Sequence, residues 1–213
     1  MKSFLVIGAG KFGHYLCREL HDAGSDVMIV DEDESKLTDM LSYVSSAKIG
    51  DCTRKSVLMT FGVEDFDAAM VCIPEDFQDS LQTVDLLKEL GAKYVLAVAS
   101  TEVQAKFLRK NGADEIIFPE RDIAKRLAVS ISNDSIFDFI NLSDEYAIYE
   151  ISAPKRWLKH TIVEINVQKN HRVNIVVIKS PSGNMKMPSA QYVFNEHDHL
   201  MVMGRKSDIE KLV

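Results

Sequence analysis

The stretch SFLVIGAGKFG at positions 3–13 decides the fold. Phe4–Ile7 is a continuous apolar run, which predicts a buried strand, and a helical pattern over 12–23 follows it. The turn between them holds three glycines in the spacing G-x-G-x-x-G. A turn of this kind between a strand and a helix is typical of dinucleotide-binding domains.

The same alternation of apolar runs and helical patterns continues outward from this stretch. Strands are predicted at 4–7, 27–30, 47–49, 68–73, 94–98 and 115–118, and helices at 12–23, 34–44, 54–61, 77–90 and 102–110. Because the strand runs are apolar throughout, we expect a parallel sheet that is covered on both faces. Residues 1–134 are therefore predicted to form an α/β domain with a Rossmann-like, doubly wound parallel sheet.

The pattern changes from about residue 146 onward. Strands are predicted at 146–152, 174–179 and 201–203, and short helices at 161–170 and 207–212, with Ser207 as the N-cap of the last one. We expect residues 135–213 to form a small C-terminal α+β domain preceded by a crossover segment. Before it, a helix predicted over 123–131 presents Ile123, Leu127 and Ile131 on one face, which either packs on the first domain or forms a dimer surface.

Composition excludes several classes of protein. Hydrophobic residues make up 46% of the chain, which is enough for a proper core, and the formal net charge is -7. An acidic chain without a basic stripe is not expected to bind nucleic acid. Its three scattered cysteines fit a reducing, cytoplasmic location better than a disulfide framework.

The glycine turn predicts a phosphate-binding loop, Gly8-Ala9-Gly10-Lys11-Phe12-Gly13. Gly8 permits the tight turn, Gly10 lets the backbone approach phosphate, and Gly13 lets helix and strand pack closely. The helix N-terminus then offers free N–H groups to an anion. Lys11 is a mobile cation suited to phosphate, although a solvent-facing lysine is the plain alternative.

Candidate contacts for the adenosine half follow the next strands. Asp31 ends the second strand, 21 residues after Gly10, where its carboxylate can accept bonds from ribose hydroxyls. Glu32 and two further acidic residues follow it, which disfavours a 2′-phosphate and hence NADP. We also expect contacts from the loop Asp51-Cys52-Thr53, whose alternative role is to cap a helix, and from Ile73-Pro74 after the fourth strand.

Catalysis is not expected. The residues after the Rossmann-like unit show no evident acid–base pair, and His197-Asp198-His199 is a weak metal signature that a turn explains better. A small NAD-dependent oxidoreductase and a free-standing dinucleotide sensor are the alternatives.

Taken in order, these motifs resemble one family over nearly the whole chain. The glycine loop, Asp31, the Gly50-Asp51-x-Thr53 loop and Pro119-Glu120 resemble the RCK (KTN/TrkA-N) domain. The tail resembles its TrkA-C companion through the residues Trp157-Leu158, Thr161, Glu164-Ile165, Asn174-Ile175, Pro188, Asp198, Leu200 and Gly204. A single N-plus-C pair is similar to the regulatory subunits of Ktr potassium uptake systems.

The resemblance implies a cytoplasmic gating subunit that forms a homo-oligomer, from a dimer up to an octameric ring, on a membrane potassium-translocating subunit of the KtrB or TrkH kind. ATP or ADP is the implied ligand, with NAD or NADH as an alternative. The resemblance also implies that Lys11 reaches a terminal phosphate and that Glu120 lies near a cation, although an ordinary carboxylate at a helix start is the plain alternative for Glu120. Val98 replaces a basic residue that is common in relatives, which weakens the case for a triphosphate.

A second ligand is implied for the C-terminal domain. Relatives that bind cyclic di-AMP present residues matching Asn174, Ile175 and Pro188, together with an arginine where this chain has Gln168. The missing arginine weakens this expectation.

Overall fold

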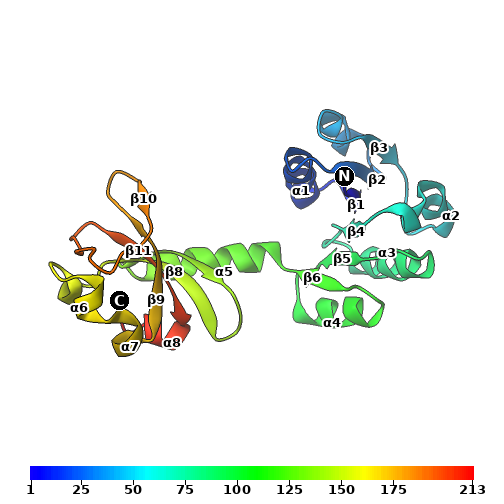
Figure 1. The fold of residues 1–213 in the computed structure, drawn as a ribbon. Coiled ribbons are helices and arrows are strands. Elements are labelled where there is room, and N and C mark those ends of the chain that lie inside the picture. The colour runs from blue at the N-terminus through cyan, green and yellow to red at the C-terminus, as the bar shows by residue number, and fades with distance from the viewer. The chain divides into compact units, whose positions relative to one another are not determined.

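The computed structural model describes residues 1–213, which divide into two compact units, Met1–Glu120 and Arg121–Val213 (Figure 1). The division falls after Glu120, whereas the sequence pattern places it after residue 134. The helix between these positions, α5 (Pro119–Ser132), explains the difference. Its Val129 packs against the core of the second unit, and its Arg126 pairs with Asp138 there.

The first unit is a six-stranded parallel sheet in the order β3-β2-β1-β4-β5-β6. Its strands are β1 (Ser3–Ile7), β2 (Asp26–Asp31), β3 (Ser46–Ile49), β4 (Ala68–Val71), β5 (Val95–Val98) and β6 (Glu115–Ile117). Its helices are α1 (Lys11–Asp22), α2 (Lys55–Leu58), α3 (Phe77–Glu89) and α4 (Glu102–Lys110). The strand order reverses between β1 and β4, which creates the crevice where doubly wound sheets bind ligands. The Rossmann-like prediction is confirmed.

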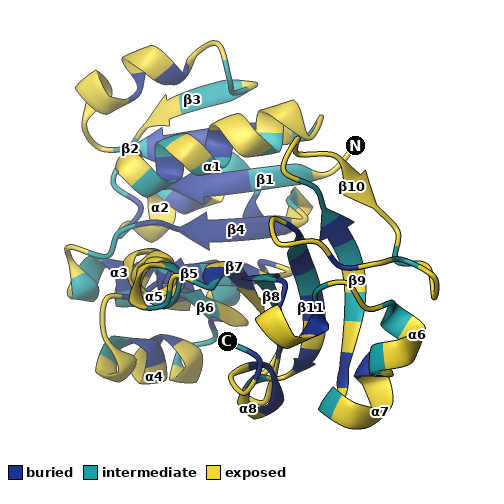
Figure 2. Ribbon diagram, turned by 90° about the vertical axis from the view of Figure 1, so that its left-hand side faces the viewer, coloured by how far each residue is buried: buried dark blue, intermediate teal, exposed yellow.

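Apolar side chains on both faces of the sheet explain why the strands read as continuous runs. Leu5 and Ile7 of β1 join the core beneath α3 and α4, whereas Val6 joins the core beneath α1. All three are at most 2% exposed, and the central strands are mostly buried along their lengths (Figure 2). Burying both faces in this way stabilises a parallel sheet.

Two predicted helices are shorter than expected. Residues 34–44 form only two 3₁₀ turns, Glu34–Lys36 and Thr38–Met40, because Leu37 and Met40 are the only buried side chains of this segment. The helix predicted at 54–61 is α2 followed by a 3₁₀ turn, Met59–Phe61, and Gly62 ends it with a φ of 66°.

The predicted helix ends agree with the structure. Gly24, Gly91 and Gly112 all have positive φ, the left-handed conformation that glycine adopts most easily after a helix. At the start of α4, Thr101 and Gln104 form a reciprocal capping box, and the side chain of Asp76 caps α3.

The second unit is a five-stranded antiparallel sheet in the order β10-β9-β11-β8-β7. Its strands are β7 (Ile136–Asn141), β8 (Tyr146–Ser152), β9 (Val173–Lys179), β10 (Met185–Lys186) and β11 (His199–Arg205), and its helices after α5 are α6 (Ile162–Ile165), α7 (Val167–His171) and α8 (Lys206–Ile209). Asn166, with φ 50°, divides the single helix predicted at 161–170 into α6 and α7. The N-cap of α8 is Arg205, so the prediction for Ser207 is wrong.

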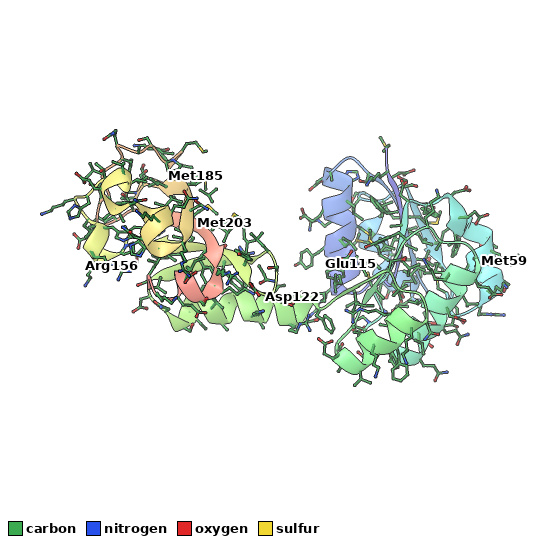
Figure 3. The ribbon with its side chains drawn as sticks, turned by 60° about the horizontal axis from the view of Figure 1, so that its bottom comes forward. Met59, Glu115, Asp122, Arg156, Met185 and Met203 are labelled. Carbon is green, nitrogen blue, oxygen red and sulfur yellow. The ribbon has the colours of Figure 1, made fainter.

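One face of this second sheet packs on the core of its unit. Trp157, Phe194 and Leu200 are among its largest fully buried side chains. Several apolar side chains lie outside this core: Met185 on β10 and Met203 on β11 are 64% and 40% exposed (Figure 3). No helix of the chain is both long enough and apolar enough to span a bilayer.

Candidate functional site

A cleft of about 580 Å³ opens in the first unit at the carboxyl ends of the central strands. Its lining comes from the ends of β1, β2 and β4, the start of α1 and the loop after β3. The residues that line it are Ile7, Gly8, Gly10, Lys11, Phe12, Val30, Asp31, Glu32, Lys36, Gly50, Asp51, Cys52, Thr53, Cys72, Ile73, Pro74, Glu75, Asp79 and Glu120. The cleft is therefore the crevice that the strand order predicts.

The three glycines of the loop face different surroundings. Gly8 has a φ of 101°, and a Cβ there would lie 2.5 Å from the carbonyl oxygen of Cys72. A Cβ at Gly13 would lie 2.1 Å from the carbonyl oxygen of Gly8, whereas one at Gly10 would meet nothing within 4 Å. Gly8 and Gly13 thus hold the loop together, and the open space at Gly10 is where a ligand can approach the backbone.

The start of α1 is open to an anion. Gly10 is its N-cap and provides no side-chain hydrogen bond, and no acidic residue lies in the first turn. The first N–H groups of the 12-residue helix therefore lack a capping partner and meet the positive end of the helix dipole. Lys11 lines the cleft beside them, which places a cation next to this anion site.

Asp31 links the glycine loop to the end of β2. Its Oδ2 accepts a hydrogen bond of 2.7 Å from the backbone N–H of Ala9, and its Oδ1 accepts one of 2.9 Å from that of Asp33. Oδ1 also faces Lys36 Nζ at 3.5 Å, whereas Oδ2 has only the bond from Ala9 and can accept a second one. Asp31 therefore fixes the loop and keeps acceptor capacity at Oδ2.

Sequence reasoning missed Lys36, whose Nζ lies 3.5 Å from the Asp31 carboxylate. Lys36 lies in a 3₁₀ turn where the sequence predicts a helix over 34–44. The predicted helix gave no reason to place this lysine in the cleft. Lys36 supplies a second cation to the cleft, beside Asp31.

The rest of the lining is acidic. Six carboxylates, those of Asp31, Glu32, Asp51, Glu75, Asp79 and Glu120, face the two cations Lys11 and Lys36. Burial raises the pKa of Asp79, and its neighbours Asp76 and Asp51 add to this shift. Asp79 was also missed, because only the fold shows that the first turn of α3 meets the loop after β3.

The loop after β3 is held by its own side chains. The Asp51 carboxylate accepts bonds from the N–H and the hydroxyl of Thr53, at 2.9 and 2.5 Å. Gln82 on α3 donates to the carbonyl oxygen of Thr53 at 2.8 Å. The N-cap of α2 is Arg54, so Asp51 and Thr53 shape the cleft wall rather than cap that helix.

Two thiols line the cleft beside the loop. Burial raises the pKa of Cys52 to about 12, helped by the charges of Asp51 and Asp31. Burial likewise raises the pKa of Cys72 to about 12. Neither thiol is a nucleophile at neutral pH, because the thiolate is the reactive form.

The structure brings most of the predicted residues together. All of the predicted nucleotide contacts line the cleft except Ala9 and Gly13. Ala9 donates to Asp31 and Gly13 packs against the carbonyl of Gly8, so these two residues hold the loop in shape. Glu120 also lines the cleft. In the second unit, Asn174 and Ile175 lie on β9 and Pro188 follows β10. Asn174 is exposed, whereas Ile175 packs against the core.

The motif His197-Asp198-His199 has a structural role. The buried Asp198 accepts bonds from the hydroxyl of Tyr192 and the N–H of Asn195, which closes the turn before β11. The Nδ1 of His199 lies 2.9 Å from Glu150 on β8. The turn reading of this motif therefore fits the contacts.

Comparison with known proteins follows the two units. The TrkA-N domain family matches residues 4–119, and the TrkA-C domain family matches residues 146–213. The chain belongs to the TrkA-N/TrkA-C family. Within it, the chain is 38% identical over 210 residues to Ktr system potassium uptake protein C of Bacillus subtilis (strain 168), covering 99% of this chain and 95% of that relative.

Solved structures with the TrkA-N/TrkA-C fold include channels. The GsuK channel bound to NAD superposes with a TM-score of 0.70 at 18% identity, over 99% of this chain and 38% of that one. GsuK bound to ADP superposes with a TM-score of 0.54 at 17% identity, over 61% of this chain and 34% of that one. At such identities these likenesses show the fold alone.

Proposed function

We propose that this TrkA-N/TrkA-C protein is a cytoplasmic, nucleotide-sensing regulatory subunit of a potassium uptake system. The similarity to a Ktr system potassium uptake protein over nearly the full length supports the assignment to a potassium uptake system. The observation that supports the sensing role is the cleft, in which an uncapped helix N-terminus, Lys11 and Asp31 face one ligand-sized space. A solved relative of the same fold that is bound to NAD and another that is bound to ADP agree with an adenine nucleotide.

The nucleotide would lie with its phosphates on the glycine loop and its ribose on Asp31. An uncapped α1 and Lys11 attract phosphate charge, and the free acceptor capacity of Asp31 suits a ribose diol. We propose ATP or ADP as the regulatory pair, with NAD or NADH as the competing ligand. Lys36 adds a cation beside the ribose. The acidic run after Asp31 in the sequence gives no sign of this positive charge.

The acidic lining suggests a cation beside the phosphates. Six carboxylates against two lysines repel a free triphosphate. No group of three or more metal-ligating side chains converges in the protein, so a cation would need phosphate oxygens to complete its shell. We propose that Glu120 contributes to such a shared site. Mg²⁺ should then strengthen ATP binding to the wild type more than to Glu120→Gln in calorimetry.

Catalysis is not part of the proposal. No histidine lines the cleft, and its two cysteine thiols stay protonated near neutral pH. An NAD-dependent oxidoreductase would consume NADH when it is offered carbonyl substrates. Sustained loss of NADH absorbance with the purified chain would therefore favour the enzyme.

The partner and the assembly belong to the same proposal. We propose a homo-oligomer, from a dimer to an octameric ring, that docks on a membrane potassium-translocating subunit. The exposed apolar residues Ile123, Leu127 and Ile131 on α5 support an interface between copies. Co-purification with such a membrane subunit would support the assignment, and stable recovery with an unrelated partner would favour a free-standing sensor.

Cyclic di-AMP binding by the second unit is a separate proposal. Asn174, Ile175 and Pro188 match residues of relatives that bind it, but Gln168 stands where those relatives have arginine. Calorimetry with cyclic di-AMP on the wild type and on Asn174→Ala tests it. If the binding heat of Asn174→Ala equals that of the wild type, Asn174 is not part of the site.

The central test changes the open glycine of the loop. Gly10→Asp places a carboxylate where nothing lies within 4 Å, so the fold should persist while ATP, ADP and NADH binding is lost. Ala23→Asp is the matched control, because Ala23 is exposed, has a φ of -76° and lies at the other end of α1, so it adds the same carboxylate without backbone strain. Retained nucleotide affinity in Gly10→Asp, measured by calorimetry, would overturn the proposed site.

A further inference from the structure

A second cavity, of about 310 Å³, opens in the C-terminal unit. It is lined by Tyr146, Arg172, Arg205 and Asp208. Tyr146 and Arg205 face each other across β8 and β11, and Arg172 directly precedes β9 on the other side of β11. Three neighbouring strands of one sheet therefore bring two arginines and a tyrosine to the same end. None of the residues proposed for cyclic di-AMP lines this cavity.

Most of the guanidinium donors in the cavity have no acceptor. Arg172 makes no side-chain hydrogen bond to the protein. Arg205 donates through Nε to the hydroxyl of Tyr146 at 3.2 Å, and its Nη2 lies 3.7 Å from the exposed Glu145. The remaining N–H groups of both arginines can therefore be satisfied by a ligand that offers several oxygens.

Asp208, the acidic residue of the cavity, forms an ion pair with Lys211. Its carboxylate accepts a 2.7 Å bond from Lys211, which together with the charges of Arg172 and Arg205 keeps its pKa below the usual value. Three cations thus surround two carboxylates, those of Asp208 and Glu145. The cavity has a local positive excess in a chain of net charge -7.

The backbone at Arg172 is left-handed. Arg172 has a φ of 58° and caps the C-terminus of α7, a position where glycine or asparagine adopts the left-handed conformation at lower cost. An asparagine at this position would therefore remove the guanidinium at no backbone cost.

Gly204 lets the two arginines share one cavity. A Cβ at this position would lie 2.8 Å from a methyl carbon of Val173 and 3.3 Å from the carbonyl oxygen of Arg172. Gly204 pairs with Val173 in the ladder between β11 and β9, so a side chain there would displace Val173 and the adjoining backbone of Arg172. The glycine thus preserves the position of Arg172 beside β11.

We propose that this cavity binds a phosphate group, either free phosphate or a phosphate monoester, between the Arg172 and Arg205 guanidiniums. A guanidinium donates two parallel hydrogen bonds to an oxyanion, and a phosphate has enough terminal oxygens for two such forks. A carboxylate has only two oxygens and satisfies one fork. The ring of Tyr146, 5.7 Å from the Arg205 guanidinium, lies beside this position and offers a face to a base if the phosphate belongs to a nucleotide.

The test separates this cavity from the glycine-loop cleft. In the full-length Gly10→Asp chain, which lacks the first phosphate site, titration with inorganic phosphate in a calorimeter should give saturable heat. Adding Arg205→Gln should weaken binding about tenfold, the usual effect of losing a charge-assisted pair. Lys186→Gln on β10, outside the cavity, makes the same charge change and should have no effect.

Arg172→Asn distinguishes a ligand role from a structural one. Asparagine tolerates the left-handed backbone, so this variant should melt at the same or a higher temperature while phosphate binding falls. AMP that binds more tightly than phosphate would assign a nucleotide as the source, and equal affinity would assign the phosphate group alone. Absence of phosphate heat, full affinity in Arg172→Asn, or acetate binding as tight as phosphate would overturn the proposal.

Discussion

At the scale of single residues, the glycine loop separates ligand contact from folding. Gly13 is enclosed by the carbonyl of Gly8, whereas Gly10 faces open space. The motif spacing is enough to predict both roles, because each follows from how a strand turns into a helix. Lys36 and Asp79 could not be predicted in the same way, because their place in the cleft depends on a 3₁₀ turn and on the packing of α3.

We expect Gly13→Ala to damage the fold rather than the ligand contact. Its methyl group would lie 2.1 Å from a backbone oxygen, which should lower the free energy of unfolding by about 3 kcal/mol, the upper end of the usual cost of overpacking. Gly10→Ala should change it by less than about 1 kcal/mol. Urea denaturation of both variants without nucleotide checks this. Equal stability of the two variants would contradict the packing argument.

The ion pair between Arg126 and Asp138 should make the second unit sensitive to acid. The hydrogen bond from Arg126 holds the pKa of Asp138 below its ordinary value of 3.8. A carboxyl with a lowered folded pKa contributes stability that is fully present above 3.8 and is lost as the pH falls through the lower folded value. Arg126→Gln should remove this loss, together with part of the neutral-pH stability.

The measurement is the urea midpoint of the second unit as a function of pH. Lys125→Gln removes the same charge from the same exposed helix without touching Asp138, so it should keep the wild-type acid dependence. If Lys125→Gln and Arg126→Gln flatten the curve equally, a general charge effect explains the result instead.

At the scale of elements, the sequence predicts best where burial is continuous and local. The strands of the first sheet read as unbroken apolar runs because both of their faces are covered, so periodicity alone identifies them. The strand β7 was not predicted, because an irregular register between Ile136 and Asp138 disturbs its alternation. The helix predicted at 34–44 does not form, because only one turn of this segment packs against a hydrophobic core.

The caps of the two units allow each to be weakened alone. Thr101 forms a capping box at the start of α4, and Thr161 forms another at the start of α6. Replacing either by alanine should cost about 1 kcal/mol through the lost N-cap bond. Calorimetry should show Thr101→Ala lowering only the transition that nucleotide stabilises, and Thr161→Ala lowering only the other. A joint shift of both transitions would show that the units unfold as one.

At the scale of the whole molecule, α5 from Arg121 onward belongs to the second unit and carries an exposed apolar stripe. Ile123, Leu127 and Ile131 are 67%, 56% and 74% exposed and lie within one face of the helix. Soluble proteins seldom leave such stripes free. The domain count was predictable from composition and pattern, but the exact division was not, because it depends on which core receives Val129.

Leu127→Asp should therefore reduce the size of the assembly. Because the side chain is already exposed, the free energy of unfolding of one chain should change by no more than about 0.5 kcal/mol. Light scattering should report a smaller particle than the wild type. Lys125→Asp places the same carboxylate on the opposite side of α5 and should leave the mass unchanged. A wild-type mass for Leu127→Asp would exclude the stripe as the interface.

Deep burial of Cys52 and Cys72 also insulates the cleft from peroxides and electrophilic drugs. Because burial raises both pKa values to about 12, the thiolate form is strongly disfavoured at neutral pH. Attack on sulfur requires that ionised form. We therefore expect both thiols to resist oxidation by peroxide under conditions that oxidise an exposed cysteine.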